Sequence, residues 1–252
     1  MKILFVGDVY GERGFEAMEK FLPQIKRDHK YHLLLVNGEN ASDGLGLREA
    51  DYKHLMKLGA HAVTLGNHSF SKHELLDYID DANIVRPANY PRSTPGKSVL
   101  TLDFNGRRIA IINVMGQVFM NDPLNSPFET MDHLLKDLEA DEIIVDIHAE
   151  ATSEKLALAH YLDGRVTAVL GTHTHVPTAD TMRLPKGTVY ITDVGMTGTK
   201  FGILGADREL VLEKFLSKRP VRLKPSNDRE LQLNAVLIDT TRKTIQAINK
   251  TD

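Results

Sequence analysis

Side chains of metal-binding type recur on short segments that follow runs of β-type residues. They include carboxylates, carboxamides and imidazoles: Asp8, Glu39, Asn40, Asn67, His148, His173 and His175. A mixed set of oxygen and nitrogen ligands suits divalent first-row metals better than Mg²⁺ or Ca²⁺, which prefer oxygen alone. One such segment would carry little weight, but several in order describe a site assembled by a sheet. The set predicts a metallohydrolase with two metal ions.

Each of these residues is expected at the carboxyl end of a strand. The segments read Gly-Asp8, Asn-Gly-Glu39-Asn40, Gly-Asn67-His68, Asp146-Ile-His148 and Gly-Thr-His173-Thr-His175. Ligands of an open α/β sheet gather at the carboxyl ends of its strands, so this shared position predicts one common site. A two-metal hydrolytic site also needs a bridging group between ions roughly 3.5–4 Å apart, and a water whose pKa falls to about 7.

The elements that must position these residues alternate between strand and helix in the first half of the chain. Apolar runs predict strands at residues 3–7, 33–36 and 62–65. Helical spacing over residues 15–25 predicts a helix that Pro23 either kinks or divides into two. A second helix is expected over residues 48–58, ending at Gly59.

The second half of the chain adds antiparallel strands. Asn105-Gly106, between strand-like runs at 98–104 and 108–114, is a strong hairpin signal. Further strands are expected at 142–147, 166–170, 188–192, 233–238 and 244–248, with helices from Ser126, from Thr152 or Ser153 to near Gly164, and over 207–216. The two strand-rich halves are expected to form two packed sheets flanked by helices, in one domain spanning residues 1–252.

Composition excludes several classes of protein. With 42% hydrophobic and 26% charged residues over 252 positions, the chain has the make-up of a globular protein. A net charge of −3 gives no attraction to nucleic acid or anionic lipid, and the lack of cysteine excludes disulfides and thiolate sites. The amino terminus lacks the pattern of a signal peptide, and no apolar run has the length of a membrane span. We therefore expect a cytoplasmic protein with no membrane partner and no dedicated nucleic-acid-binding surface.

In their order along the chain, these motifs resemble the signature of calcineurin-like dinuclear metallophosphoesterases. Within that superfamily, the segments at residues 37–40, 146–155, 171–180 and 193–198 are similar to the YmdB-like branch, and the similarity covers nearly the whole chain. The resemblance implies an α/β fold, a calcineurin-like metallophosphoesterase sandwich of two mixed β-sheets flanked by helices (αββα).

The chain departs from the wider superfamily at the first two motifs. Tyr10 stands where many relatives have the histidine of Asp-x-His, and Glu39 stands where they have aspartate. Loss of that histidine leaves Asn40 to help complete the metal shell. Phe70 occupies a position where this branch is expected to carry tryptophan, but it is not a ligand.

The resemblance also implies a role for each candidate residue. One metal ion is held by Asp8, Glu39, Asn40 and His175, and the other by Glu39, Asn67, His148 and His173, so that Glu39 bridges. His68 is implied as the catalytic side chain, which protonates the leaving oxygen or stabilises charge on the transferring group.

The implied reaction is metal-dependent hydrolysis of phosphodiesters by in-line attack of a metal-bound hydroxide. The implied substrates are small phosphodiesters, cyclic nucleotides of the 2′,3′-cyclic AMP type among them. The implied cofactors are two divalent or trivalent ions, iron or manganese, with zinc also compatible.

Structural roles compete with chemical ones at individual positions. Asp8 and Asn67 could cap the helices that follow them, because Asp and Asn are favoured at helix starts. His173 and His175 could be a chance pair in a chain with 11 histidines. Glu150 either supports a ligand or caps a helix, and His68 could only hydrogen-bond a ligand. These alternatives stay open on sequence.

Two other function classes fit the sequence less well than a phosphoesterase. An amidohydrolase-type enzyme would carry its His-x-His pair after the first strand, whereas here the pair comes late. A metal-binding regulatory protein with little turnover would be favoured by degenerate ligands or by loss of His68, and neither is seen.

Several features have no single interpretation. Lys200, Arg86 and Asn89 are either phosphate or base contacts or ordinary surface residues. The segment from Met115 to Met120 is either a loop over the site or part of the core. The sequence leaves open the metal identity, the physiological substrate and the oligomeric state, a homo-oligomer being one of the states that it allows.

Overall fold

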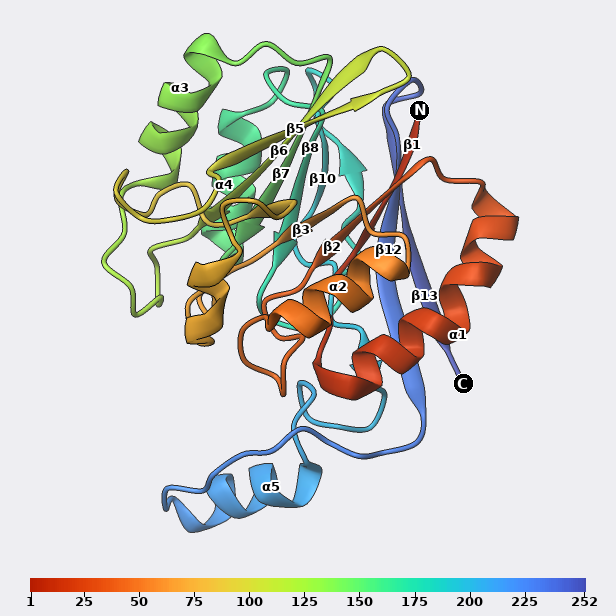
Figure 1. Cartoon of the computed structure of the whole chain (residues 1–252), viewed down its shortest axis with the longest axis vertical. Coiled ribbons are helices and arrows are strands. Elements are labelled where there is room, and N and C mark those ends of the chain that lie inside the picture. The colour runs from red at the N-terminus through yellow and green to blue at the C-terminus, as the bar shows by residue number, and fades with distance from the viewer.

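Two β-sheets pack face to face in the computed structural model, which describes residues 1–252. Helices α1 and α2 lie on one outer side of the strands, and α3 and α4 lie on the other (Figure 1). The expected α/β sandwich with an αββα order of layers is therefore confirmed.

The first sheet combines strands from both ends of the chain. Its order is β11-β12-β1-β2-β3-β4, with β13 also paired to β12. The bounds are β1 (Lys2–Val6), β2 (Leu33–Asn37), β3 (Ala62–Thr64), β4 (Ile84–Val85), β11 (Gly198–Thr199), β12 (Leu231–Asp239) and β13 (Thr244–Thr251). Strands β1 to β4 run parallel to one another, while β12 is antiparallel to β1.

The second sheet is built from the middle of the chain, in the order β5-β6-β7-β8-β10-β9. Its strands are β5 (Val99–Phe104), β6 (Arg107–Met115), β7 (Glu142–His148), β8 (Ala168–Thr172), β9 (Met182–Arg183) and β10 (Val189–Ile191). The β5–β6 hairpin turns at Asn105 and Gly106, both at positive φ, which confirms the predicted tight turn. Strands β6, β7, β8 and β10 are parallel, so their carboxyl ends meet at one edge.

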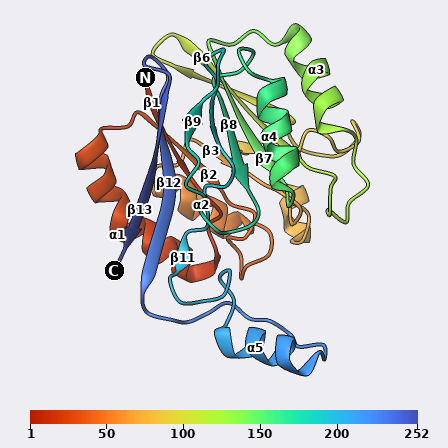
Figure 2. The same cartoon turned by 180° about the vertical axis from the view of Figure 1, so that it is seen from behind.

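Four of the five helices, α1 to α4, connect parallel strands, whereas α5 lies between the antiparallel strands β11 and β12. The helices are α1 (Gly11–His29), α2 (Glu49–Lys57), α3 (Pro127–Asp137), α4 (Thr152–Tyr161) and α5 (Arg208–Ser217), with a 3₁₀ turn η1 (His73–Asp77). Ser126 caps α3 through a hydrogen bond from the Glu129 amide, as its sequence predicted. Helix α5 lies apart from the other helices, beyond one end of both sheets (Figures 1 and 2).

Alternating side chains divide the core into three apolar layers. In β1, Phe5 faces the second sheet and packs in the layer between the sheets, whereas Leu4 packs under α1. Across the second sheet, Val145 belongs to the layer under α3 and α4, while Ile144 faces inward. Both faces of these strands are buried, which accounts for their uninterrupted apolar sequences. Each fully buried aliphatic or aromatic side chain contributes about 1.5–3 kcal/mol.

The structure excludes one of the two alternatives at Pro23 and corrects two other expectations about the elements. Helix α1 continues through Pro23 to His29, so no second helix starts there. Helix α4 follows Ala151 without a side-chain cap and ends at Tyr161, short of Gly164. The halves of the chain do not correspond to the two sheets, because the terminal hairpin β12–β13 pairs with β1 and completes the first sheet.

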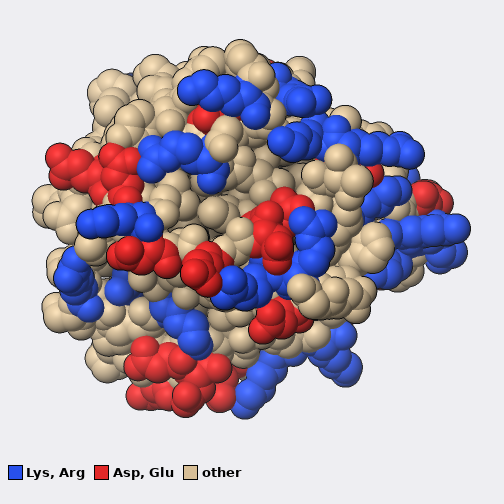
Figure 3. Space-filling view, turned by 90° about the horizontal axis from the view of Figure 1, so that it is seen from above, with Lys and Arg blue, Asp and Glu red and all other residues tan.

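The surface carries charges of both signs. Figure 3 looks down on the upper end of Figure 1 and shows basic and acidic side chains interspersed over that face. None of the helices combines the length and the hydropathy needed to span a lipid bilayer.

Candidate metal centre

The sequence-predicted site residues lie where the parallel strands end. Asp8 follows β1, Glu39 follows β2, Asn67 follows β3, His148 is the last residue of β7, and His173 follows β8. Strand β1 starts at the upper end of Figure 1 and runs toward the end from which α5 projects. The two packed sheets thus bring side chains from both halves of the sandwich to one edge, as the strand-end argument predicts.

His148 is the centre of the closest group. Its Nε2 atom lies 2.9 Å from Asn67 Oδ1, 3.0 Å from His173 Nδ1 and 3.2 Å from Glu39 Oε1. Glu39, His148 and His173 also present one ligand atom each within 4.8 Å of one another. All these atoms can donate a lone pair to a cation, so the cluster has the chemistry of a metal shell.

The orientation of His148 is held from behind by residues that sequence reasoning did not single out. Its Nδ1 atom lies 2.8 Å from Thr172 Oγ1, and that hydroxyl donates to Asp146 Oδ1 at 2.7 Å. Thr64 and Asn37 donate to the other Asp146 oxygen. This buried chain of hydrogen bonds directs Nε2 toward Glu39, because a metal-binding histidine is oriented by the partner of its other ring nitrogen. The available signal was an aspartate inside an otherwise apolar strand.

Electrostatics couple the members of the cluster. Burial alone would raise the pKa of Glu39, but the charges and hydrogen bonds of His148 and His68 hold it well below its usual value. Burial opposes a charged His148, yet the carboxylates of Glu39, Asp8 and Asp146 raise its pKa to about 9. Burial and the nearby His148 lower the pKa of His173 to about 3, leaving that ring neutral and able to donate a lone pair.

Asp8 is fully buried beside this cluster. Its Oδ2 accepts a hydrogen bond from the His173 amide at 3.3 Å, whereas its Oδ1 has no partner and lies 4.0 Å from His148 Nδ1. Burial raises the pKa of Asp8 well above its usual value. A buried carboxylate oxygen without a partner is costly, and a cation at this edge would satisfy it. The residues present therefore fit a metal.

A second pair lies next to the first group. His175 Nε2 is 3.2 Å from Asn40 Oδ1, and His175 Nδ1 is 3.0 Å from the backbone carbonyl of Leu204. The carbonyl accepts a hydrogen bond from Nδ1–H, which leaves Nε2 free to donate a lone pair. Burial lowers the pKa of His175, which favours the same neutral form.

His68 borders the cluster but faces a cavity. Its Nδ1 lies 3.3 Å from Glu39 Oε1 and 3.2 Å from Asn40 Nδ2, while its Nε2 lies 3.2 Å from Asn67 Nδ2. Its backbone amide donates to Glu39 Oε2 at 3.0 Å. The ring is thus positioned by three candidate ligands and still lines open space.

Only glycine fits at position 66, next to the cluster. A Cβ there would lie 2.3 Å from Glu39 Oε2 and 2.4 Å from His148 Nε2. These distances are too short for real contacts, so the absence of a side chain lets the β3 loop carry Asn67 and His68 to the site.

The geometry excludes a helix-capping role for Asp8, Asn67 and Glu150. Helix α1 starts after Tyr10 and uses no side-chain cap, so Asp8 does not cap it. Asn67 is followed by η1, whose preceding residue is Lys72, so Asn67 is not a cap either. Glu150 is not the N-cap of α4, and its Oε2 lies 3.3 Å from His173 Nε2.

Arg86 and Asn89 are neither surface residues nor contacts of the cluster. The Arg86 guanidinium is buried and donates to the carbonyls of residues 87, 94 and 95. Asn89 is fully buried and bonds the backbone of Met115 and Asn125. Lys200 is partly exposed and lies 3.6 Å from Glu230. Met115 belongs to the core, whereas Phe119 is exposed.

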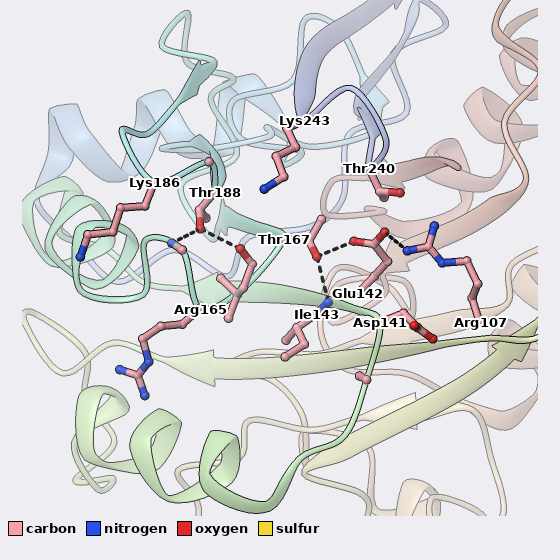
Figure 4. Close-up of a pocket in the computed structure, with 14 residues that line it drawn as sticks. Arg107, Asp141, Glu142, Ile143, Arg165, Thr167, Lys186, Thr188, Thr240 and Lys243 are labelled. Carbon is pink, nitrogen blue, oxygen red and sulfur yellow. Dashed lines mark hydrogen bonds and ion pairs between the residues drawn. The ribbon is translucent and has the colours of Figure 1, made fainter.

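A second polar cavity of about 380 Å³ lies at the opposite edge of the second sheet. Figure 4 shows Arg107 and Thr167 directed toward Glu142, the first residue of β7. Lys186 and Lys243 also line it. None of the predicted metal-binding residues contributes to this cavity, and its carboxylate is occupied by hydrogen bonds.

The comparisons with known proteins agree with this arrangement. The model of the YmdB-like protein family matches residues 4–251. The chain belongs to this family. The prediction drawn from the motifs is thereby confirmed, and the match extends over nearly the whole chain. The fold of the family and the Glu39–His148–His173 cluster imply a site for divalent metal ions.

Three relatives illustrate the similarity of this YmdB-like chain. The 2′,3′-cyclic-nucleotide 2′-phosphodiesterase of Bacillus subtilis is 48% identical over 251 residues, covering 98% of this chain and 94% of that protein. A crystal structure of a hypothetical protein from Thermus thermophilus is 44% identical, with a TM-score of 0.95 and full coverage of both chains. A phosphatase from Mycoplasma pneumoniae is 37% identical, with a TM-score of 0.92 over 100% of this chain and 93% of that one.

Proposed function

We propose that this protein is a metal-dependent phosphodiesterase that hydrolyses 2′,3′-cyclic nucleotides to nucleoside monophosphates. The observation that carries the proposal is the convergence of Asn67, His173 and Glu39 on His148 Nε2 at 2.9–3.2 Å. Support for the substrate comes from the Bacillus subtilis relative, whose name describes that activity and which aligns with this chain nearly end to end.

The candidate ligands divide into two overlapping sets, which supports a centre of two ions. Glu39, Asn67, His148 and His173 form the set that is already in mutual contact. Asp8, Asn40 and His175, with Glu39, form the other. The mixture of imidazole, amide and carboxylate favours iron or manganese, with zinc also compatible. Because both sheets supply ligands, the whole chain would act as one domain.

The bound ions would supply an activated water and neutralise charge on the phosphate. The chain itself positions the reacting groups. His68 faces the cavity and is held by Glu39 and Asn40, so its ring can protonate the oxygen that leaves when one P–O bond of the cyclic ester breaks. Glu39 also accepts a hydrogen bond from the His68 backbone amide, which fixes the position of the His68 ring relative to the candidate ligands.

The test is hydrolysis of 2′,3′-cyclic AMP by purified protein that has been stripped with a chelator and then given Mn²⁺. The proposal predicts no turnover after stripping and restored turnover with Mn²⁺. Stoichiometric Mn²⁺ binding without turnover of 2′,3′-cyclic AMP or of a generic phosphodiester would overturn it and favour a metal-binding regulatory protein.

A further inference from the structure

The metal centre opens into a cavity that continues well beyond the candidate ligands. The cavity has a volume of about 570 Å³, within the range of about 300–1,000 Å³ typical of small-molecule sites. His68, His173 and His175 line one part of it. Much of the rest is apolar, and its aliphatic and phenylalanine lining residues are Leu45, Ile203, Leu204, Ala206, Val211, Phe215 and Leu223.

Most of this apolar wall comes from residues 203–225, the segment that includes α5. Helix α5 projects beyond the end of the sheets in both ribbon views (Figures 1 and 2). Short antiparallel bridges, Ile203 with Ala206 and Ala206 with Pro225, hold the two ends of the segment together. The segment thus encloses the cavity from the side opposite the sheets, without joining either sheet.

The wall is physically connected to a candidate ligand. The Leu204 carbonyl lies 3.0 Å from His175 Nδ1, and the Tyr10 ring packs edge-on against His175 with centroids 5.6 Å apart. Leu204 has a positive φ of 52°, followed by Gly205 at 88°, so a tight turn brings this carbonyl to the imidazole. A molecule whose phosphate lies among the histidines would therefore have its remaining part against Leu204 and its neighbours.

The wall exposes apolar surface that folding alone does not require. Phe215 is 66% exposed and Leu204 is 50% exposed, although both border the cavity. Exposed apolar groups gathered around a cavity mark a binding surface. Most of the further polar side chains that line the cavity already have partners within the protein. Asp43 is paired with Arg48 and Lys72, Glu150 lies 3.3 Å from His173, and the Thr174 hydroxyl donates to Asp193. Tyr10 and Lys214 also line the cavity.

We propose that Leu204 and Phe215 form a subsite that holds the nucleobase of the substrate by apolar contact and ring stacking. The inference rests on the proposed function, because it places the cyclic phosphate at the metal centre. An aromatic side chain stacks on any base, since every base offers a π face. Because the Leu204 and Phe215 side chains offer no hydrogen-bond donor or acceptor, the subsite binds purines and pyrimidines alike.

The experiment compares substrates with and without a base on matched variants of the Mn²⁺-loaded enzyme. The substrates are 2′,3′-cyclic AMP, 2′,3′-cyclic UMP and glycerol 1,2-cyclic phosphate, which keeps the cyclic ester but lacks the base. Phe215→Ala is the test variant, and Leu216→Ala is the control, because Leu216 is 84% exposed on the same helix and does not line the cavity.

Phe215→Ala is expected to raise KM for both cyclic nucleotides about tenfold, with kcat unchanged and with little effect on the glycerol ester. Leu216→Ala is expected to behave as the wild type. Equal effects of Phe215→Ala on all three substrates, or no effect on any, would overturn the subsite.

Failure of the proposed function gives a different result. If the wild type hydrolyses none of the three esters, the proposed phosphodiesterase activity is overturned. The subsite is then tested by ligand binding instead of turnover. Calorimetric titration with 3′-AMP would then compare the wild type with Phe215→Ala. Weaker binding by the variant would support the subsite, and equal binding would exclude it.

Discussion

The ammonium of Lys155 lies 2.8 Å from Asp193 Oδ2, and both side chains are fully buried. The same Asp193 oxygen accepts hydrogen bonds from the amide and the hydroxyl of Thr174. Thr174 separates His173 and His175, which have positive φ values of 99° and 67°. Such conformations cost about 1–3 kcal/mol each and persist only where the surroundings hold them. The buried ion pair therefore anchors the loop that carries both histidines.

Lys155→Met is expected to destabilise the fold by about 3–5 kcal/mol, because it leaves Asp193 as a buried charge without its partner. Urea unfolding measures this loss. Lys186→Met is the matched control, since Lys186 is exposed and has no ion-pair partner, and its effect should stay within about 0.5 kcal/mol. Equal stability of the two variants would show that the ion pair does not anchor the loop.

His68→Ala is expected to keep its metal and to lose activity by about 10²–10⁴-fold, as for removal of a general acid. Elemental analysis and steady-state kinetics on the same preparation separate the two effects. His133→Ala, on the exposed side of α3, serves as the control and should retain full activity. Loss of metal from His68→Ala would make His68 a ligand or a structural residue.

Glu39→Ala is expected to lose both ions together, since this carboxylate is proposed to bridge them. Metal content after gel filtration is the measurement. Glu150→Ala should keep both ions at saturating metal, because Glu150 contacts His173 at Nε2, whereas the Nδ1 atom of His173 faces His148. A full complement of metal in Glu39→Ala would contradict the bridging role.

Metal binding is expected to release at least one proton at pH 7. The carboxylates around His148 raise its pKa to about 9, so its ring is protonated in the metal-free protein. A cation that binds this ring must displace the proton. For one proton, the apparent affinity should rise about tenfold per pH unit up to that pKa and then level off. Calorimetry of Mn²⁺ binding in buffers with different ionisation enthalpies counts the protons, and identical heats in all buffers would refute the prediction.

Asp180→Asn is expected to destabilise the protein at pH 7, and this loss should shrink as the pH falls below about 3.9. The carboxylate is partly buried, yet hydrogen bonds from Thr178 and Thr192 outweigh that burial and hold the pKa of Asp180 below its usual value. A lowered folded-state pKa stabilises above the unfolded value of about 3.9, and the effect disappears as pH falls. Solvent screening limits the loss to about 1 kcal/mol. A difference in unfolding free energy that does not change with pH would contradict this explanation.

Sequence patterns were sufficient to place the candidate ligands. Asp8, Glu39, Asn67, His148 and His173 each follow or end an apolar run, and the structure brings all of them to one edge. The reason is geometric, because the carboxyl ends of neighbouring parallel strands cannot be far apart. The turn at Asn105 and Gly106 was predictable in the same way, from local backbone preference.

Partners distant in the chain were not predictable. The hydrogen bond between Thr172 and Asp146, which helps to orient His148, joins residues 26 positions apart in the sequence. The ion pair of Lys155 and Asp193 joins residues 38 positions apart. Burial of a charged side chain was not predictable either. The sequence allowed Arg86 to lie on the surface, but its guanidinium is buried and donates hydrogen bonds to three backbone carbonyls. Residue type alone does not reveal which polar group will satisfy another after folding.

The sequence by itself determined the types of the candidate ligands, their positions at strand ends and the layered α/β class, because these depend on residue chemistry and short-range periodicity. Only the tertiary structure decided that β12 completes the first sheet, that Asp8 keeps an oxygen without a partner, and that residues 203–225 face the histidines. Those features depend on which distant surfaces bury one another, and long-range packing leaves no periodic trace in the chain.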